Sequence, residues 1–156
     1  MEIERKWLVD IKDIPYDLDK LDINEIEQTY LCFSPTIRIR KIVNKNRFIV
    51  TVKTKVKDSN LSREEYEFNI SEHDFNKLLK ETNNKTLYKT RYRIKEGKYT
   101  YEIDLFHKDY EGLCYLEIEF ESEDEANSFV PPSWIKEEVT DSKEYTNAAL
   151  ARKLSK

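Results

Sequence analysis

The sequence contains little glycine, histidine or cysteine, and each scarcity removes a class of site. Only 2 of the 156 residues are glycine, so no glycine-rich loop is available to cradle a phosphate, and side chains must hold any phosphate. With 2 histidines, a histidine-ligated zinc site is not expected. The 2 cysteines, Cys32 and Cys114, fall in predicted strands, where we expect reduced packing residues rather than a disulfide.

The chain also has no apolar run long enough to span a bilayer and no secretory signal, so we expect a cytoplasmic protein without a membrane partner. A net charge of -4 argues against a nucleic-acid-binding surface. What the sequence has in excess is charge of both signs: 37% of residues are charged, against roughly a quarter in typical soluble domains. The length suits one domain, residues 1-156, with a real core.

The charges recur at every second position of segments whose alternate positions are apolar. In the first segment, residues 2-6, a strand would place Glu2, Glu4 and Lys6 on one face. The same spacing groups Arg38 with Arg40, Thr51 with Lys53, Arg63 with Glu65 and Glu67, Lys89 with Arg91 and Arg93, Glu102 with Asp104, and Glu117 with Glu119. Each segment therefore has one apolar and one densely charged face.

Two architectures fit this pattern. In a sandwich the apolar faces meet and the charged faces meet water, and this is the commoner solution. In a closed barrel the charged faces line the lumen and the apolar faces pack under helices. Basic residues gather on some segments and acidic residues on others, instead of mixing as they would for solubility. A lumen with a basic wall and an acidic wall would bind a polyanion through metal ions. The alternation alone slightly favours the sandwich, whereas the grouping of charges favours the barrel.

The periodicity predicts about eight strands and three main helices. We expect strands over residues 2-8, 26-33, 36-43, 47-54, 63-70, 87-95, 98-106 and 114-121. Ser71 caps a predicted helix that ends near Thr82. Capping boxes of Ser122 with Glu125 and of Asp141 with Glu144 predict helices over residues 122-130 and 142-154.

This ordered set of segments resembles the CYTH superfamily, also called triphosphate tunnel metalloenzymes. The run Glu2-Ile3-Glu4-Arg5-Lys6 matches the ExExK signature of that family, and the resemblance continues through residues 28-31, 38-40, 51-53, 63-67, 89-92, 102-104, 117-119, 139-141 and 145-150. It implies an α+β fold: a single-domain, closed, eight-stranded antiparallel β-barrel, or tunnel, with helices packed outside. The resemblance therefore replaces the sandwich with the barrel.

The resemblance also implies roles for the charged residues. The predicted metal-binding residues, for Mg²⁺ or Mn²⁺, are Glu2, Glu4, Asp104, Glu117 and Glu119. The predicted substrate-binding residues are Lys6, Arg38, Arg40, Lys53, Arg63, Arg91, Arg93 and Lys143. Glu4, Lys89 and Glu119 are the predicted catalytic residues, with Lys89 contacting substrate or positioning water. Glu65 and Glu67 either match acids of the family or hold the arginines in place, and Lys143 either covers the tunnel mouth or is simply solvated.

The motifs determine the ligand class better than the reaction. The resemblance is strongest to the bacterial tripolyphosphatase type, which predicts metal-dependent hydrolysis of inorganic tripolyphosphate to pyrophosphate and phosphate by in-line attack of water. The alternatives are a class IV adenylate cyclase that converts ATP to cyclic AMP, a thiamine triphosphatase, and a non-catalytic polyphosphate-binding module. The expected partner is thus a small polyanionic substrate, and the resemblance leaves a homodimer open.

Overall fold

The computed structural model describes residues 2–55 and 62–155, without the side chains of Glu2 and Ser62. Its eight strands are β1 (Glu2–Leu8), β2 (Asp22–Phe33), β3 (Thr36–Ile42), β4 (Arg47–Lys55), β5 (Ser62–Asn69), β6 (Leu87–Glu96), β7 (Tyr99–His107) and β8 (Cys114–Phe120). The α-helices are α1 (Glu72–Glu81), α2 (Glu123–Ser128) and α3 (Asn147–Leu154). Short 3₁₀ helices are η1 (Ile11–Asp13), η2 (Leu18–Lys20), η3 (Val43–Lys45), η4 (Lys108–Tyr110) and η5 (Lys143–Tyr145).

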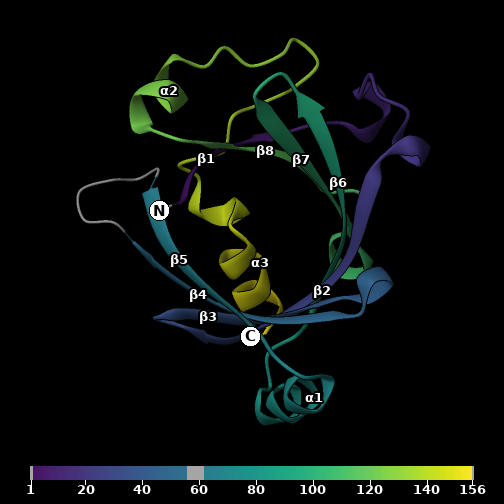
Figure 1. Ribbon diagram of the computed structural model, residues 1–156, viewed down its shortest axis with the longest axis vertical. Helices are drawn as coiled ribbons and strands as arrows, with labels where there is room; N and C mark the ends of the chain where they lie inside the picture. The colour runs from purple at the N-terminus through teal and green to yellow at the C-terminus, as the bar shows by residue number, and fades with distance from the viewer. Residues whose placement is uncertain (1, 56–61, 156) are drawn as a thin grey trace.

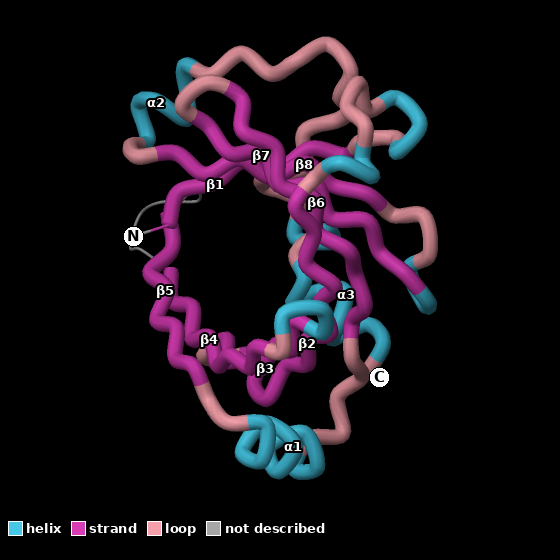
Figure 2. Tube along the Cα trace, turned by 45° about the vertical axis from the view of Figure 1, so that its right-hand side comes forward, coloured by secondary structure: helices cyan, strands magenta, loops and turns pink. Residues whose placement is uncertain are grey.

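The strands form a closed antiparallel barrel in the order β1-β5-β4-β3-β2-β6-β7-β8 (Figures 1 and 2). β1 pairs with β8 along most of its length, from Ile3 opposite Phe120 to Leu8 opposite Tyr115. It meets β5 only at one end, through Glu2 opposite Arg63 and Ile3 opposite Ser62. The predicted eight-stranded barrel is confirmed, and its β1–β5 seam is short.

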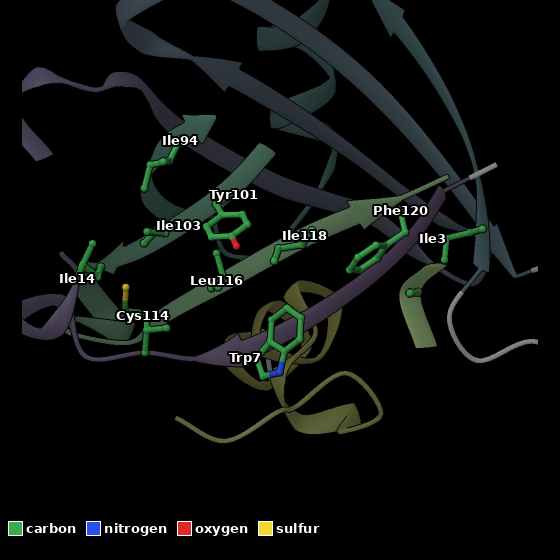
Figure 3. Packing of buried hydrophobic residues seen from close by; sticks show 12 residues of the cluster. Ile3, Trp7, Ile14, Ile94, Tyr101, Ile103, Cys114, Leu116, Ile118 and Phe120 are labelled. Atoms are coloured by element: carbon green, nitrogen blue, oxygen red, sulfur yellow. The ribbon is translucent and has the colours of Figure 1, made fainter. Parts of the chain in front are cut away.

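The outward faces of the strands are apolar, as the alternation predicts. On β1, β7 and β8 these faces build a buried cluster around Trp7, Ile103 and Leu116 (Figure 3), which the segments that follow β1 and β8 cover. On the opposite side of the barrel, α1 packs Phe75 against Ile39 and Phe48. Because most apolar faces are buried outside the ring of strands, the charged faces are left for the lumen, although the outward Tyr66 and Phe68 of β5 remain exposed.

Helix α3 lies across one end of the barrel. Its buried residues Leu150 and Ala151 pack against Tyr30, Phe106 and Tyr115, which share the inward face of their strands with the charged residues. The lumen therefore has an apolar floor at the α3 end and a charged zone next to it.

The boundaries of the last helix differ from the prediction. The Asp141–Glu144 capping box does not open a helix at Ser142: a 3₁₀ turn, η5, occupies that segment, and α3 begins at Asn147. The cap is Thr146, whose side chain accepts a hydrogen bond from the Ala149 amide at 3.0 Å. The hydroxyl of Thr146, five residues after Asp141, is therefore the acceptor for the free amide groups of the first turn of α3. The Ser71 and Ser122 caps are confirmed.

Two further observations concern expected absences. No helix among residues 2–55 and 62–155 is both long enough and apolar enough to cross a membrane. Cys32 and Cys114 are free thiols, and Cys114 is buried in the outer cluster.

Candidate active site in the lumen

The barrel register brings the charged side chains of β6, β7 and β8 together. Arg91 lies opposite Asp104, and Glu102 lies opposite Glu117 on the next strand. On the far side of β8, Glu117 faces Lys6 and Glu119 faces Glu4 of β1. Since cross-strand neighbours on one face lie about 5 Å apart, these residues form a continuous surface of basic and acidic groups.

Asp104 is the centre of a buried ion-pair cluster. It is fully buried, and Arg91 donates to both of its oxygens, from Nε at 2.7 Å and from Nη2 at 2.9 Å. Lys89 Nζ donates to Asp104 Oδ2 at 2.8 Å, and the Lys89 side chain is also fully buried. Two cations therefore share the Asp104 carboxylate, and Arg91 Nη1 also lies 3.6 Å from Glu102 Oε1.

The pKa values follow from this crowding. Burial alone would raise the pKa of Asp104, but Arg91 and Lys89 lower it well below the usual range of a carboxyl group. Burial lowers the pKa of Lys89 to about 7, against the attraction of Asp104 and with help from the nearby cations Arg91 and Arg40. The cluster is therefore an electrostatically loaded region, of the kind that accumulates at functional sites.

Arg38 and Arg40 extend the basic wall along β3. The Nε of Arg38 is buried without a hydrogen-bond partner among the described residues. Arg40 donates from Nε and Nη2 to Gln28 Oε1, at 3.1 and 2.7 Å. Burial and the neighbouring cations Arg38 and Arg91 lower the pKa of Arg40. Neither guanidinium group forms an ion pair with a carboxylate among the described residues, so both are suited to a bound anion.

The acidic wall contains a buried carboxylate oxygen that no described residue satisfies. Glu117 is buried, and its Oε1 has no hydrogen-bond partner among the described residues. The nearest cation is Lys6, whose Nζ lies 3.9 Å from that oxygen and donates to the Tyr145 carbonyl at 3.2 Å. A buried acceptor without a donor is costly, so this oxygen marks a place where a ligand is expected.

The remaining predicted residues lie around this centre. Lys53 is 3.8 Å from Glu65, and Arg93, half exposed, is 3.7 Å from Glu102. Arg63 pairs with Glu2 across the seam, and the side chain of Glu2 is outside the described residues. Lys143 is exposed in η5, just before α3. Arg93 is connected to the Asp104 cluster through Glu102, which also lies 3.6 Å from Arg91.

Two uncharged members of the site, Gln28 and Asn147, were not predicted from the sequence. Asn147, the first residue of α3, accepts hydrogen bonds at Oδ1 from Gln28 Nε2 at 2.9 Å and from Lys89 Nζ at 3.1 Å. Gln28 has the parity of an inward-facing residue on β2, which was an available signal. The position of Asn147 depends on how α3 folds back, which no local pattern indicates.

A family model for the CYTH domain matches residues 1–146. The chain belongs to the CYTH family. It is 37% identical over 154 residues to an inorganic triphosphatase of Nitrosomonas europaea, covering 96% of each chain, and 33% identical over 152 residues to one of Acetivibrio thermocellus, covering 97% of this chain and 93% of the relative. The crystal structure of an inorganic triphosphatase superposes with a TM-score of 0.68 at 34% identity, covering 97% of this CYTH chain and 94% of that one.

Proposed function

We propose that this protein is an inorganic triphosphatase that hydrolyses tripolyphosphate to pyrophosphate and phosphate with Mg²⁺ or Mn²⁺. The observation that carries the proposal is a barrel lumen in which, among the described residues, the buried Arg38 and the half-buried Arg40 form no ion pair and a buried oxygen of Glu117 has no donor. A polyanion satisfies the first and a cation satisfies the second. The names of the two relatives, both inorganic triphosphatases, point to the same activity.

The residues present fit a divalent cation in their donor chemistry. Carboxylate oxygens are the ligands that Mg²⁺ and Mn²⁺ prefer, and Glu117 contributes the unsatisfied oxygen Oε1. Glu4 and Glu119 face each other across β1 and β8, next to the pair Lys6 and Glu117. Among the described side chains, no three acidic, histidine or cysteine groups are already gathered around one point. We assign Glu4, Glu117 and Glu119 as ligands, together with Glu2 from the same face of β1.

Asp104 receives a different role in this proposal. Both of its oxygens accept hydrogen bonds from Arg91 or Lys89, so neither is open to a cation without breaking an ion pair. We therefore assign Asp104 to orienting the basic wall, in place of the metal-binding role that the resemblance implied.

The basic wall binds the phosphate chain. Arg38, Arg40 and Arg91 present forked donors that suit phosphate oxygens, and Lys6 and Lys89 add point charges. A bound divalent cation would shield the phosphates from the carboxylates and polarise the attacked phosphorus. The fixed cations stabilise the charge that develops on the transferred phosphoryl group when water attacks in line. Lys53, Arg63, Arg93 and Lys143 would contact the substrate farther along the tunnel.

A substrate panel tests this function directly. The purified protein is incubated with Mg²⁺ and with tripolyphosphate, ATP, thiamine triphosphate or long-chain polyphosphate, and phosphate, pyrophosphate and cyclic AMP are measured. The proposal predicts preference for tripolyphosphate, with equal amounts of phosphate and pyrophosphate. Formation of cyclic AMP from ATP would show that the protein is a cyclase instead of a triphosphatase. Binding of tripolyphosphate without hydrolysis would show that it is a non-catalytic binding module. The cytoplasmic location and the homodimer stay predictions.

A further inference from the structure

Two amide side chains connect the two sides of the basic wall. Arg40 donates twice to Gln28 Oε1, Gln28 Nε2 donates to Asn147 Oδ1 at 2.9 Å, and Lys89 Nζ donates to the same oxygen at 3.1 Å. Lys89 in turn donates to Asp104. A continuous hydrogen-bonded chain therefore runs from β3 through β2 and the first residue of α3 to β6 and β7.

The groups at the two ends of this hydrogen-bonded chain, Arg40 and Lys89, determine the orientation of both side-chain amides. A guanidinium and an ammonium group can only donate, so Gln28 must present its oxygen to Arg40 and its nitrogen to Asn147. Asn147 must then present its oxygen to Gln28 and Lys89. Gln28 is 0% exposed and Lys89 1%, whereas Arg40 and Asn147 are half-buried, so the two buried members limit the access of water to these bonds. A buried network with one satisfied arrangement holds its members in place.

The use of amides instead of carboxylates has an electrostatic consequence. Lys89 and Arg91 share the charge of Asp104, whereas no carboxylate in the described part of the chain lies within 4.0 Å of Arg40. Gln28 thus orients the Arg40 guanidinium without neutralising it. A glutamate at position 28 could accept the same two hydrogen bonds but would cancel the charge that attracts a polyanion.

We propose that Gln28 and Asn147 are positioning residues that hold Arg40 and Lys89 at a fixed separation for neighbouring phosphate groups of the substrate. The proposal rests on the proposed function, because it assumes that these cations bind phosphate. Helix α3 thereby takes part in substrate binding through Asn147, one residue beyond the end of the matched CYTH domain.

A double-mutant cycle with tripolyphosphate tests this link. Asn147→Leu keeps the size of the side chain but removes the acceptor, and we expect kcat/KM to fall about tenfold, as for one lost hydrogen bond to a charged group. Arg40→Ala lowers kcat/KM by itself. In the double variant we expect a loss smaller than the product of the two single losses, because the hydrogen-bonded chain from Asn147 no longer has an Arg40 side chain to hold. Thr146→Ala is the matched control: it removes the α3 cap but leaves Asn147, and we expect a change of no more than about twofold in kcat/KM.

The outcomes separate positioning from stability. If Thr146→Ala reproduces the Asn147→Leu loss, or if the Asn147 and Arg40 losses multiply, Asn147 serves only to fold α3 and the proposal is overturned. If Asn147→Leu fails to fold, Gln28→Leu replaces it in the same double-mutant cycle, because it breaks the hydrogen-bonded chain between Arg40 and Asn147. Gln28→Glu adds a second readout: it breaks the bond to Asn147 as Gln28→Leu does but also adds a negative charge beside Arg40, so we expect a larger rise in KM than in Gln28→Leu, and a KM no higher than that of Gln28→Leu would contradict the neutral-amide argument. A wild-type protein that does not hydrolyse tripolyphosphate would overturn the proposed function instead. The affinity of the same variants for tripolyphosphate would then still test whether Gln28 and Asn147 position the two cations.

Discussion

Asp104 and Glu117 are both buried acids on the inner face of the barrel, on neighbouring strands, but their surroundings differ. Asp104 accepts three hydrogen bonds from two cations, whereas Glu117 has one oxygen without a donor among the described residues. Burial and the proximity of Asp104 would raise the pKa of Glu117, yet Lys6, with smaller effects of Arg91 and Lys89, lowers it to about 2. Both groups are therefore ionised at neutral pH, although only Asp104 has its bonding capacity filled.

This difference separates two tasks within one charged wall. Asp104 uses its charge inside the protein, where it fixes Lys89 and Arg91 and offsets their mutual repulsion. Glu117 has one oxygen that no described residue satisfies, and we propose that this oxygen binds a metal ion. The same division appears among the arginines, since Arg91 is held by Asp104, while Arg40 is oriented by a neutral amide. A charged cavity can thus contain both charged groups that bind one another within the protein and groups that remain available to ligands.

The largest effect should come from Asp104→Asn. This change leaves two buried cations without their shared carboxylate, and breaking a buried ion pair in this way costs about 3–5 kcal/mol. We expect the free energy of unfolding, measured with urea, to fall by that amount. Because the role of Asp104 is internal, added Mg²⁺ should not restore the stability. A variant as stable as the wild type would contradict the framework role.

The pH dependence of the free energy of unfolding tests the same role of Asp104 in the wild-type protein, without a substitution. The folded-state pKa values of Asp104 and Glu117 lie below those of the unfolded chain, so their stabilisation is present above about pH 4 and is lost as the pH falls through the folded-state values. We expect the free energy of unfolding to decrease between about pH 4 and 2. Asp104→Asn should show a shallower decrease. Equal slopes would mean that Asp104 does not gain its charge stabilisation from Lys89 and Arg91.

Glu117→Gln should leave the fold intact and remove activity. The amide keeps the shape of the side chain but lacks the charge that a hard divalent cation needs, and we expect kcat/KM for tripolyphosphate to fall at least about a hundredfold. Part of the loss should be recovered at high Mn²⁺. Glu111→Gln, an exposed acid beside His107 at the 3₁₀ turn after β7, is the matched control and should retain full activity. An active Glu117→Gln protein would show that the unsatisfied oxygen is not a metal ligand.

Arg40→Ala should have a smaller effect that does not depend on the rest of the substrate. Loss of a forked, charge-assisted donor is worth roughly 1.5–3 kcal/mol, or about ten- to a hundredfold in kcat/KM. Because the lost contacts are to phosphate oxygens, the penalty should be similar for tripolyphosphate and ATP. A loss confined to ATP would place Arg40 near the base or ribose.

The sequence was a good guide to the strands and to the charged faces. Alternation is a local property, so the inward positions of Arg38, Arg91 and Glu117 could be assigned from parity once the barrel was inferred. β2 begins at Asp22, four residues before the prediction, because its first residues pair with β6, from Asp22 opposite Arg93 onward. Such long-range pairing leaves no trace in a local pattern.

The partners of the charged residues were not predictable in the same way. The choice of Asp104 as a framework residue depends on the register between β6 and β7, and the role of Asn147 depends on the path of η5 and α3. Acids that look alike in the sequence, such as Asp104 and Glu117, are distinguished only by which cations the register brings to them. The fold was thus predictable from patterns, whereas the different roles of the acids in the lumen depend on contacts between distant strands that no local pattern indicates.

The most direct test of this account is the binding of Mn²⁺ in the presence of tripolyphosphate, measured by electron paramagnetic resonance as the fraction of Mn²⁺ that is bound. We predict that the wild type and Glu111→Gln bind Mn²⁺ with the same affinity, and that Glu117→Gln binds it at least about tenfold more weakly. Equal Mn²⁺ affinity in Glu117→Gln and wild type would contradict the central claim that Glu117, unlike Asp104, keeps its oxygen for a metal.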